Sequence, residues 1–228
     1  MGRPRKFSKE RLQAAALAIV DAHGLAGLSM RALATELGTG PMTIYNHVRS
    51  RADLDVLVVD GVVAQAHRSP AHHDDWRDEV REVATAAWRA VRAHPHAIPL
   101  ILTRRSRSPA VLEVTEALLT ALSRSGRSGR GLLIAFRAVS ALVMGFAQGE
   151  LAGPLSSAAG EPAEVVIRRF RALPRDRYPR LIEIARAALA SKAETEFRRG
   201  LDVLLAGLTL ESASRIPPRR QRQRRRER

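Results

Sequence analysis

The 228-residue sequence contains no cysteine, which excludes a disulfide framework and any metal site built on thiolates. Aromatic residues make up only 4% of the chain, and the alternating apolar pattern of β-strands is not found. No apolar run approaches the roughly 20 residues that span a bilayer. The first residues are polar and basic and lack the apolar segment of a signal peptide. We therefore expect a helical, cytoplasmic protein without membrane contact.

The sequence motifs of enzymes are also missing. There is no nucleophile elbow or clustered pair of carboxylates, and the glycine-containing stretch near residue 130 lacks the lysine of a phosphate-binding loop. His67, His72 and His73 lie close together, but they span a predicted loop without clear carboxylate geometry. The sequence thus predicts no enzymatic activity, no metal and no cofactor.

Negative charge is scarce, because 38 Lys and Arg face 23 Asp and Glu and leave a net charge of +15. Residues 215–228 contain eight arginines and one glutamate, and residues 1–11 contain five basic residues and one glutamate. Both ends of the sequence are therefore basic arms around a body that is closer to neutral. Such arms suit a phosphate backbone, since each neutralised phosphate releases a counterion. A solvated end without a specific partner is the alternative.

The segment from Leu28 to Leu54 predicts two short helices joined by a tight turn. Its apolar residues recur at helical spacing, Ser29 stands at an N-cap position, and Pro41 suits the first turn of the second helix. Gly38 between them can provide a left-handed C-cap. An apolar helical stripe at about residues 12–23 precedes this pair. The segment predicts DNA binding, because the second helix of such a pair can enter a major groove.

The rest of the sequence has an almost wholly helical pattern. We expect helices at about residues 52–67, 75–93, 108–122, 131–151, 163–172, 178–189 and 193–210, with a short apolar segment at 100–102. The predicted domains are a DNA-binding domain at residues 1–51 with a basic arm at 1–7, a helical domain at 52–212, and a basic tail at 213–228.

The run from Gly38 to Leu54, GTGPMTIYNHVRSRADL, resembles the recognition segment of the TetR family of one-component repressors. Ile44 and Val48 replace that family's usual Leu and Phe, and both keep an apolar group. The resemblance implies an all-α fold, with an N-terminal three-helix helix-turn-helix DNA-binding domain and a larger C-terminal helical ligand-binding and dimerisation domain. It also implies a repressor that binds a palindromic operator as a homodimer and is released by a small, largely apolar effector.

The predicted recognition helix carries few groups that can identify a base. Asn46 can form two hydrogen bonds with one base, and adenine suits it best. Pro41, Met42 and the methyl group of Thr43 can pack on the methyl groups of thymine. Base preference is therefore expected to combine one polar contact with apolar ones.

The resemblance adds roles for four further side chains. In the family, the residues that match Tyr45, His47 and Arg51 hold phosphates, and the residue that matches Arg31 can reach a base. An exposed arginine with no partner is the alternative for Arg31. The full set of expected DNA-binding residues is Arg31, Thr39, Gly40, Pro41, Met42, Thr43, Tyr45, Asn46, His47 and Arg51.

Residues 196–208, EFRRGLDVLLAGL, resemble the closing helix of the subgroup that contains the tetracycline repressors. In those repressors, a histidine, an asparagine and a second histidine hold the drug and its magnesium ion. The matching positions here are His67, Val83 and Ile101. Magnesium needs oxygen or comparable polar ligands, which Val83 and Ile101 cannot supply. We therefore do not expect magnesium–tetracycline to be the effector.

An apolar effector pocket is expected between helices of the body, as in other helical bundles. Ordinary core packing is the alternative for each of its apolar candidates. The candidate lining residues are His67, Trp88, Leu102, Leu119, Val143, Met144 and Gln148.

The resemblance also places the helices near 131–151 and 194–210 in a four-helix bundle across a two-fold axis. The long apolar stripe of the last helix supports this prediction, although the same stripe could pack inside one protomer. The candidate dimerisation residues are Phe136, Val139, Phe197, Leu201, Leu204, Leu205 and Leu208.

Two other interpretations stay open. The basic arms also fit a low-specificity architectural DNA-binding protein, and the same DNA-binding motif serves activators as well as repressors. A preference of roughly a thousandfold for one palindrome would distinguish a specific regulator from an architectural protein. The expected partners are double-stranded DNA, a small-molecule effector and a second copy of the chain.

Overall fold

The computed structural model describes residues 7–66, 73–104, 107–152, 162–188 and 192–214, and these residues form helices and their connections without a strand. The elements are α1 (Lys9–Gly27), α2 (Met30–Glu36), α3 (Pro41–Tyr45), α4 (Arg51–Ala64), α5 (Trp76–Ala93), a 3-10 helix η1 (Pro95–Ala97), α6 (Ile98–Arg104), α7 (Pro109–Ser123), α8 (Gly129–Ala152), α9 (Ala163–Arg171), α10 (Pro179–Ala188) and α11 (Ala193–Ser214). This confirms the expected all-α fold.

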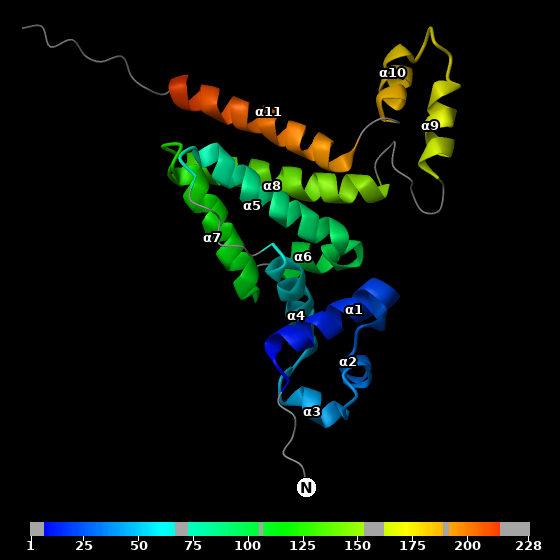
Figure 1. Ribbon diagram of the computed structural model, residues 1–228, viewed down its shortest axis with the longest axis vertical. Coiled ribbons are helices and arrows are strands. Elements are labelled where there is room, and N and C mark those ends of the chain that lie inside the picture. Colours follow the sequence, from blue (N-terminus) through cyan, green and yellow to red (C-terminus); the bar gives the residue numbers. More distant parts are fainter. Residues whose placement is uncertain (1–6, 67–72, 105–106, 153–161, 189–191, 215–228) are drawn as a thin grey trace, which may run out of the picture.

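Helices α1 to α3 form a small unit at one end of the molecule, and α4 joins it to the larger body (Figure 1). Helix α4 packs along α1 on one side and against α6 and α7 on the other. In the body, α5 packs against α7, α8 and α11, while α9 and α10 pack against each other. Helix α4 is therefore the element that both parts of the molecule share.

Local side chains explain where the helices of the small unit begin and end. The hydroxyls of Ser8, Ser29 and Ser50 each accept the backbone N–H three residues later, at 3.3, 3.1 and 3.1 Å, and so cap α1, α2 and α4. Gly38 has a φ of 64° after α2, a conformation that L-residues with a side chain rarely adopt. The turn before α3 is thus determined by the local sequence.

The core of the body is centred on two stacked rings. Trp88 of α5 and Phe197 of α11 lie face to face with their centroids 4.8 Å apart, and the Phe146 ring of α8 meets Phe197 edge-on at 5.7 Å. A Cβ atom added at Gly200 would lie 3.1 Å from the Phe146 ring, so this glycine permits the close approach of α11 to α8. The last helix is therefore part of the protomer core.

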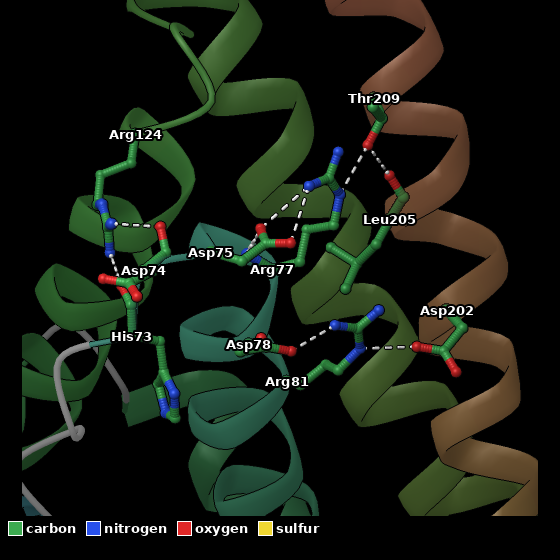
Figure 2. A network of polar contacts seen from close by, with 10 residues as sticks. All are labelled: His73, Asp74, Asp75, Arg77, Asp78, Arg81, Arg124, Asp202, Leu205 and Thr209. Atoms are coloured by element: carbon green, nitrogen blue, oxygen red, sulfur yellow. Dashed lines mark hydrogen bonds and ion pairs between the residues drawn. The ribbon is translucent and has the colours of Figure 1, made fainter.

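Charged side chains also join α5 to α11, and Figure 2 shows two of these links. Arg77 Nε donates to Thr209 Oγ1 at 3.1 Å, and Arg81 Nε donates to Asp202 Oδ1 at 2.8 Å. The hydrogen bond to Asp202 raises the pKa of Arg81. A similar bond from Arg89 lowers the pKa of Glu194 near the start of α11. The arginines of α5 thus hold α11 along much of its length.

The beginning of α5 is held by Asp75 and Arg124. Asp75 Oδ1 accepts the backbone N–H of Arg77 at 2.9 Å, and this bond holds the pKa of the carboxyl below its usual range. Arg124, which follows α7, donates to the carbonyls of His73 and Asp74 at 2.8 and 3.0 Å (Figure 2). The start of α5 is thus bonded to the end of α7.

Helix α8 is long and apolar. By length and composition, Gly129–Gly149 could cross a membrane, with a mean hydropathy of 1.6, although the sequence had suggested that no segment qualifies. One face of this helix packs against α5, α7 and α11. Its apolar character therefore has a structural use in the core of the body.

Most predicted helix boundaries agree with the structure, because Ser108, Pro109 and similar residues mark them. Helix α1 is longer than expected, since the chain continues through a kink at Gly24 with a φ of 66°. Helix α6 and η1 were anticipated only as a short apolar segment. Pro95 and Pro99 interrupt the periodic pattern there, and a helix of seven residues shows little periodicity.

Candidate DNA-binding and effector sites

Helix α3 presents a polar and apolar surface to solvent while its other face is buried. Ile44 and Val48 are 0% and 1% exposed, whereas Met42 and Tyr45 are 77% and 49% exposed. Asn46 is also exposed. The apolar pair fastens α3 to the unit, so the side chains free to meet a base belong to the opposite face. We call Met42, Tyr45 and Asn46 the reading surface.

The other residues expected to bind DNA surround this reading surface. Pro41, Gly40 and Arg31 are exposed, while Thr39, Thr43 and His47 are half-buried. Arg31 lies on α2, and only its carbonyl has a described bond, to the Thr35 hydroxyl at 3.0 Å. Contacts of these residues with DNA remain predictions.

Arg51, which the resemblance places against a phosphate, also has partners within the protein. Its Nε donates to Asp55 Oδ1 at 2.9 Å, and its Nη1 and Nη2 donate to the carbonyls of Leu28 and Leu25. All three nitrogens of the guanidinium therefore have partners within the protein. These bonds fasten the connection between α1 and α2 to the start of α4, while the side chain stays 54% exposed, so the expected phosphate contact remains a prediction.

A cavity of about 130 Å³ lies between the helices of the body. Its wall is almost entirely apolar, and the hydroxyls of Thr115 and Ser140 are its polar groups among the described lining residues. These residues come from α4 to α8: Val63, Ala66, Val83, Ala84, Ala87, Ala90, Val91, Ile101, Val111, Val114, Thr115, Leu118, Phe136, Ser140, Val143 and Met144. Such a site suits an apolar molecule with a few hydrogen-bonding groups.

The sequence located part of this cavity. Val143 and Met144 line it, and Val83 and Ile101, which argued against a magnesium ligand set, line it as well. Phe136, expected at a dimer interface, also belongs to the wall. The missed residues are mainly small ones on α5 and apolar ones on α7, whose pattern does not differ from that of ordinary core.

Four of the seven residues expected to line the effector pocket do not line this cavity, and a fifth lies outside the described residues. Trp88 is 1% exposed and stacks on Phe197, and its indole N–H has no partner among the described residues. Leu102 is 43% exposed, Leu119 is half-buried outside the cavity lining, and Gln148 is exposed. His67 lies outside the described residues. We therefore correct the expected lining at Trp88, Leu102, Leu119 and Gln148.

A larger hollow of about 750 Å³ is lined mainly by residues of α5, α7 and α11. Charged residues line much of it, and several pair with each other. Arg81 bonds to Asp202 at 2.8 Å and to Asp78 at 2.7 Å. An apolar effector would have to cover these charged side chains, so the hollow suits it less well than the smaller, apolar cavity does.

One wall of the apolar cavity connects with α1 through Asp60 of α4. This carboxylate is 2% exposed, accepts the hydroxyl of Ser108, and forms an ion pair with Lys9 Nζ at 2.8 Å. Ser108 also caps α7, where its oxygen accepts the Val111 N–H at 3.2 Å. Since Val111 lines the cavity, Asp60 links the cavity wall with the first residue of α1.

A second buried aspartate of α4 makes a similar link. Asp55 is 3% exposed and accepts Arg51 Nε at 2.9 Å and Arg104 Nε at 3.3 Å. Arg104 is the last residue of α6, three residues after Ile101 in the cavity wall. Asp55 therefore joins α6 to Arg51, which in turn holds the carbonyls of the connection between α1 and α2.

Histidines after α5 provide a third connection with α1. His94 Nδ1 lies 2.8 Å from Asp21 Oδ2, and His94 Nε2 lies 2.8 Å from the Gln65 side-chain amide. His96 Nδ1 lies 3.2 Å from the Val20 carbonyl. The second half of α1 is thus bonded to the segment between α5 and α6, while Lys9 at its start pairs with α4.

The residues expected at a dimer interface are mostly buried within one protomer. Phe197, Leu201 and Leu205 are 0% exposed, as is Val139, and Leu208 is 7% exposed. Leu204 is half-buried. We therefore correct this expectation, because α5 and α8 already cover the apolar stripe of α11. For Val139, Phe197, Leu201, Leu205 and Leu208, the alternative of packing inside one protomer is the right one.

A different apolar surface of α8 and α11 faces solvent. Leu133, Ile134 and Val203 are 43%, 49% and 75% exposed. The same two helices also carry exposed small residues, which would let another helix approach closely: Ala141, Gly145, Ala206 and Gly207. We call this set the outer face of α8 and α11.

Comparison with known proteins agrees with this architecture. Residues 12–54 match the family model described as bacterial regulatory proteins, tetR family, and residues 69–211 match the tetracyclin repressor-like C-terminal domain. The transcriptional repressor DrrR1 of Streptomyces coeruleorubidus is 33% identical over 62% of this chain, which corresponds to about half (53%) of DrrR1. A transcriptional regulator of Saccharopolyspora erythraea is 29% identical over 89% of this chain and 84% of its own length.

Among solved structures, apo ActR from Streptomyces coelicolor superposes with a TM-score of 0.75 at 27% identity, covering 94% of this chain and 99% of ActR. Both halves of the molecule, the reading surface and the helical body, therefore have counterparts in one family. This chain belongs to the TetR family of transcriptional regulators.

Proposed function

We propose that this protein is a ligand-responsive repressor that binds a palindromic operator as a homodimer and releases it when a small, largely apolar effector enters the cavity. The observation that carries the proposal is the connection between the apolar cavity and the helices that carry the reading surface. The DNA-reading unit, which comprises α1 to α3 and Arg51 at the start of α4, shares the buried carboxylates Asp55 and Asp60 with residues beside the cavity wall.

The expected effector follows from the cavity wall. An apolar body would fill the space between α5, α7 and α8, and its polar groups would bond to the hydroxyls of Thr115 and Ser140. ActR, a similar protein, has been solved in complex with actinorhodin, which supports a small-molecule effector for this fold. Val83 and Ile101 in the wall argue against magnesium–tetracycline.

The coupling would operate through the two aspartates of α4. A ligand that pushes α6 or α7 outward would displace Arg104 or Ser108, and each of these groups shares a carboxylate with a cation of the DNA-reading unit. The reading surface would then change its orientation. An effector can act in this way only if it binds the released conformation more tightly than the operator-bound one.

Dimerisation would use the outer face of α8 and α11. An operator with two half-sites one helical turn apart, about 34 Å, needs two reading surfaces related by a two-fold axis. The exposed apolar and small residues of the outer face provide a self-complementary surface on which α8 and α11 of two copies would pack.

The decisive experiment selects the protein's preferred DNA from a random pool and then tests the effect of small molecules. Enrichment of one inverted repeat, preferred roughly a thousandfold or more at physiological salt, supports a specific regulator. Binding of all sequences with similar affinity would contradict the proposal and favour a low-specificity architectural DNA-binding protein.

The cavity is tested by the variant Ala87→Leu, which adds a larger side chain to its wall. Operator affinity is measured by fluorescence anisotropy with actinorhodin and a panel of planar apolar compounds. A compound that weakens operator binding by the native protein should have a much smaller effect on the variant. If it released both proteins equally, the cavity would not be the effector site.

A further inference from the structure

We propose that the effector is an amphipathic anion, whose apolar part fills the cavity and whose anionic group, such as a carboxylate, binds Arg89 and Arg198 in the neighbouring hollow. This inference rests on the proposed function, because it takes the apolar cavity as the effector site. The volume of that cavity indicates a ligand that extends beyond it. At about 130 Å³ it is smaller than the roughly 300–1,000 Å³ of ordinary small-molecule sites, whereas the hollow, at about 750 Å³, falls within that range.

The hollow and the cavity are neighbours. Ala66, Val83 and Val114 are the described residues that line both spaces. They come from the end of α4, from α5 and from α7, and their side chains are small or β-branched. Because all three are apolar, a ligand that extends from the cavity into the hollow meets an apolar boundary first and charged groups beyond it.

Helix α5 carries a row of side chains from this boundary to the charged part of the hollow. Val83, Ala86 and Arg89 are spaced three residues apart, so they share one face of the helix, and all three line the hollow. The helix rises about 9 Å from Val83 to Arg89. Helix α11 adds Leu201 and Arg198 to the same lining. A ligand of about this length would place its charged end beside the two arginines.

Arg89 and Arg198 are two cations that share one carboxylate. Arg89 donates from Nε and Nη2 to Glu194 at 3.2 and 2.5 Å, and Arg198 Nη2 lies 2.9 Å from the same carboxylate. Both arginines line the hollow, whereas Glu194 is not among its described lining residues. A guanidinium has five N–H donors, so these contacts leave N–H groups for a second acceptor. The pair therefore places one unbalanced positive charge beside the hollow.

The other charged groups of the hollow disfavour an anion. Arg81 already bonds to two carboxylates, Asp78 at 2.7 Å and Asp202 at 2.8 Å (Figure 2). Glu82 adds another carboxylate, which lies 2.9 Å from His73 Nε2. An anion would be repelled there and attracted to the two arginines that share one acid. A carboxylate suits that place, because it can accept two parallel N–H bonds from a guanidinium.

The test uses three probes with the same alkyl chain and different ends: decanoate, decanamide and decylammonium. Isothermal titration calorimetry measures their binding to the full-length protein at neutral pH. Decanoate should bind about tenfold more tightly than decanamide, because charge-assisted hydrogen bonds are stronger than neutral ones. Decylammonium should bind more weakly than decanoate. Absence of decanoate binding, equal affinity of decanoate and decanamide, or tighter binding of decylammonium would each overturn the inference.

Variants then locate the anionic end of the probe. Arg198→Gln should weaken decanoate about tenfold and leave decanamide unchanged. The matched control is Arg199→Gln, which removes the same charge from an exposed residue that is not among the described residues of the hollow. Glu194→Gln should strengthen decanoate severalfold, because it removes the carboxylate that competes for the arginines. Equal effects of Arg198→Gln and Arg199→Gln would contradict a specific site.

Ala87→Leu locates the apolar end, because this residue lines the cavity but is not among the described residues of the hollow. It should weaken decanoate and decanamide by the same factor. Unchanged affinity for both would mean that the alkyl chain does not enter the cavity, against the inference. Far-UV circular dichroism checks that each variant folds, and the variants of Arg198 and Glu194 decide by themselves should Ala87→Leu not fold.

Operator binding separates this inference from the proposed function. Decanoate should weaken binding of the selected operator more than decanamide does at the same concentration. If decanamide released the operator as effectively as decanoate, the proposed function would stand and the inference would be wrong. Failure of the protein to select any operator from random DNA would instead overturn the proposed function.

Discussion

The buried carboxylates of α4 are the residues whose positions most need an explanation. Asp55 and Asp60 are 3% and 2% exposed, although a buried charge costs several kcal/mol unless partners compensate it. Each aspartate has two donors, one from the DNA-reading unit and one from the body. Their burial is therefore tolerated only while both parts of the molecule stay in place, which makes them suitable for coupling.

Ser108→Ala tests the Asp60 connection. This change removes the cap of α7 and also a hydrogen bond to a buried carboxylate, so it should lower the free energy of unfolding by about 2–3 kcal/mol. Ser50→Ala, which removes a cap alone, should cost about 1 kcal/mol. Urea denaturation at a fixed protein concentration compares the two variants. Equal losses would show that the bond to Asp60 adds nothing to stability.

Arg51→Ala distinguishes a structural role from a phosphate contact. Its three guanidinium nitrogens bond within the protein. A role limited to these bonds predicts that the variant binds the operator more weakly without a change in the slope of log affinity against log salt. The measurement is anisotropy with labelled operator over a range of salt concentrations. A slope reduced by about one would mean that Arg51 contacts a phosphate in the complex.

Asn46→Ala addresses base readout at the exposed end of α3. The variant should lose its preference at one operator position in each half-site and keep its affinity for the same DNA changed at that position. Competition binding with single-base operator variants measures this preference. An unchanged preference at every position would exclude Asn46 from direct readout.

At the scale of elements, short-range signals explain most of the fold. The serines before α1, α2 and α4, and Ser108 with Pro109 before α7, cap or start helices from the residues beside them, and these starts were predictable. Helix α6 was not, since its seven residues lie among prolines. The missed helix contributes Ile101 to the cavity and Arg104 to the link with Asp55, so an incomplete prediction of elements left the coupling path unseen.

The cap of α5 should make its stability depend on pH. The hydrogen bond from the Arg77 N–H lowers the pKa of Asp75 in the folded state, so its stabilisation is present above the unfolded pKa and is lost as pH falls through the folded one. Asp75→Ala should cost about 1 kcal/mol at pH 7 and progressively less in acid. Asp74→Ala, a neighbouring change without a cap, serves as the control. A cost that stayed constant down to pH 2 would contradict this assignment.

At the scale of the whole molecule, the outer face of α8 and α11 is an apolar surface that faces solvent in the described structure. Ile134→Arg should disrupt the proposed dimer, because it would place a charge from each protomer in an apolar interface. Leu112→Arg, at a residue of α7 that is 55% exposed, is the matched control and should remain dimeric. Size-exclusion chromatography with light scattering gives the mass of both. Dimers of Ile134→Arg at micromolar concentration would exclude this interface.

The sequence by itself determined the family, the all-helical fold and the exposed recognition helix, because caps, turns and an apolar period of 3.6 residues act over short distances. It could not determine what covers each apolar stripe, since a stripe has the same spacing whether it packs inside one chain or between two. Only the tertiary structure placed Phe197 and Leu201 in the protomer core and left Ile134 exposed. Likewise, only folding brings Lys9, Asp60 and Ser108 together, because electrostatic and hydrogen-bonding partners depend on distances in space.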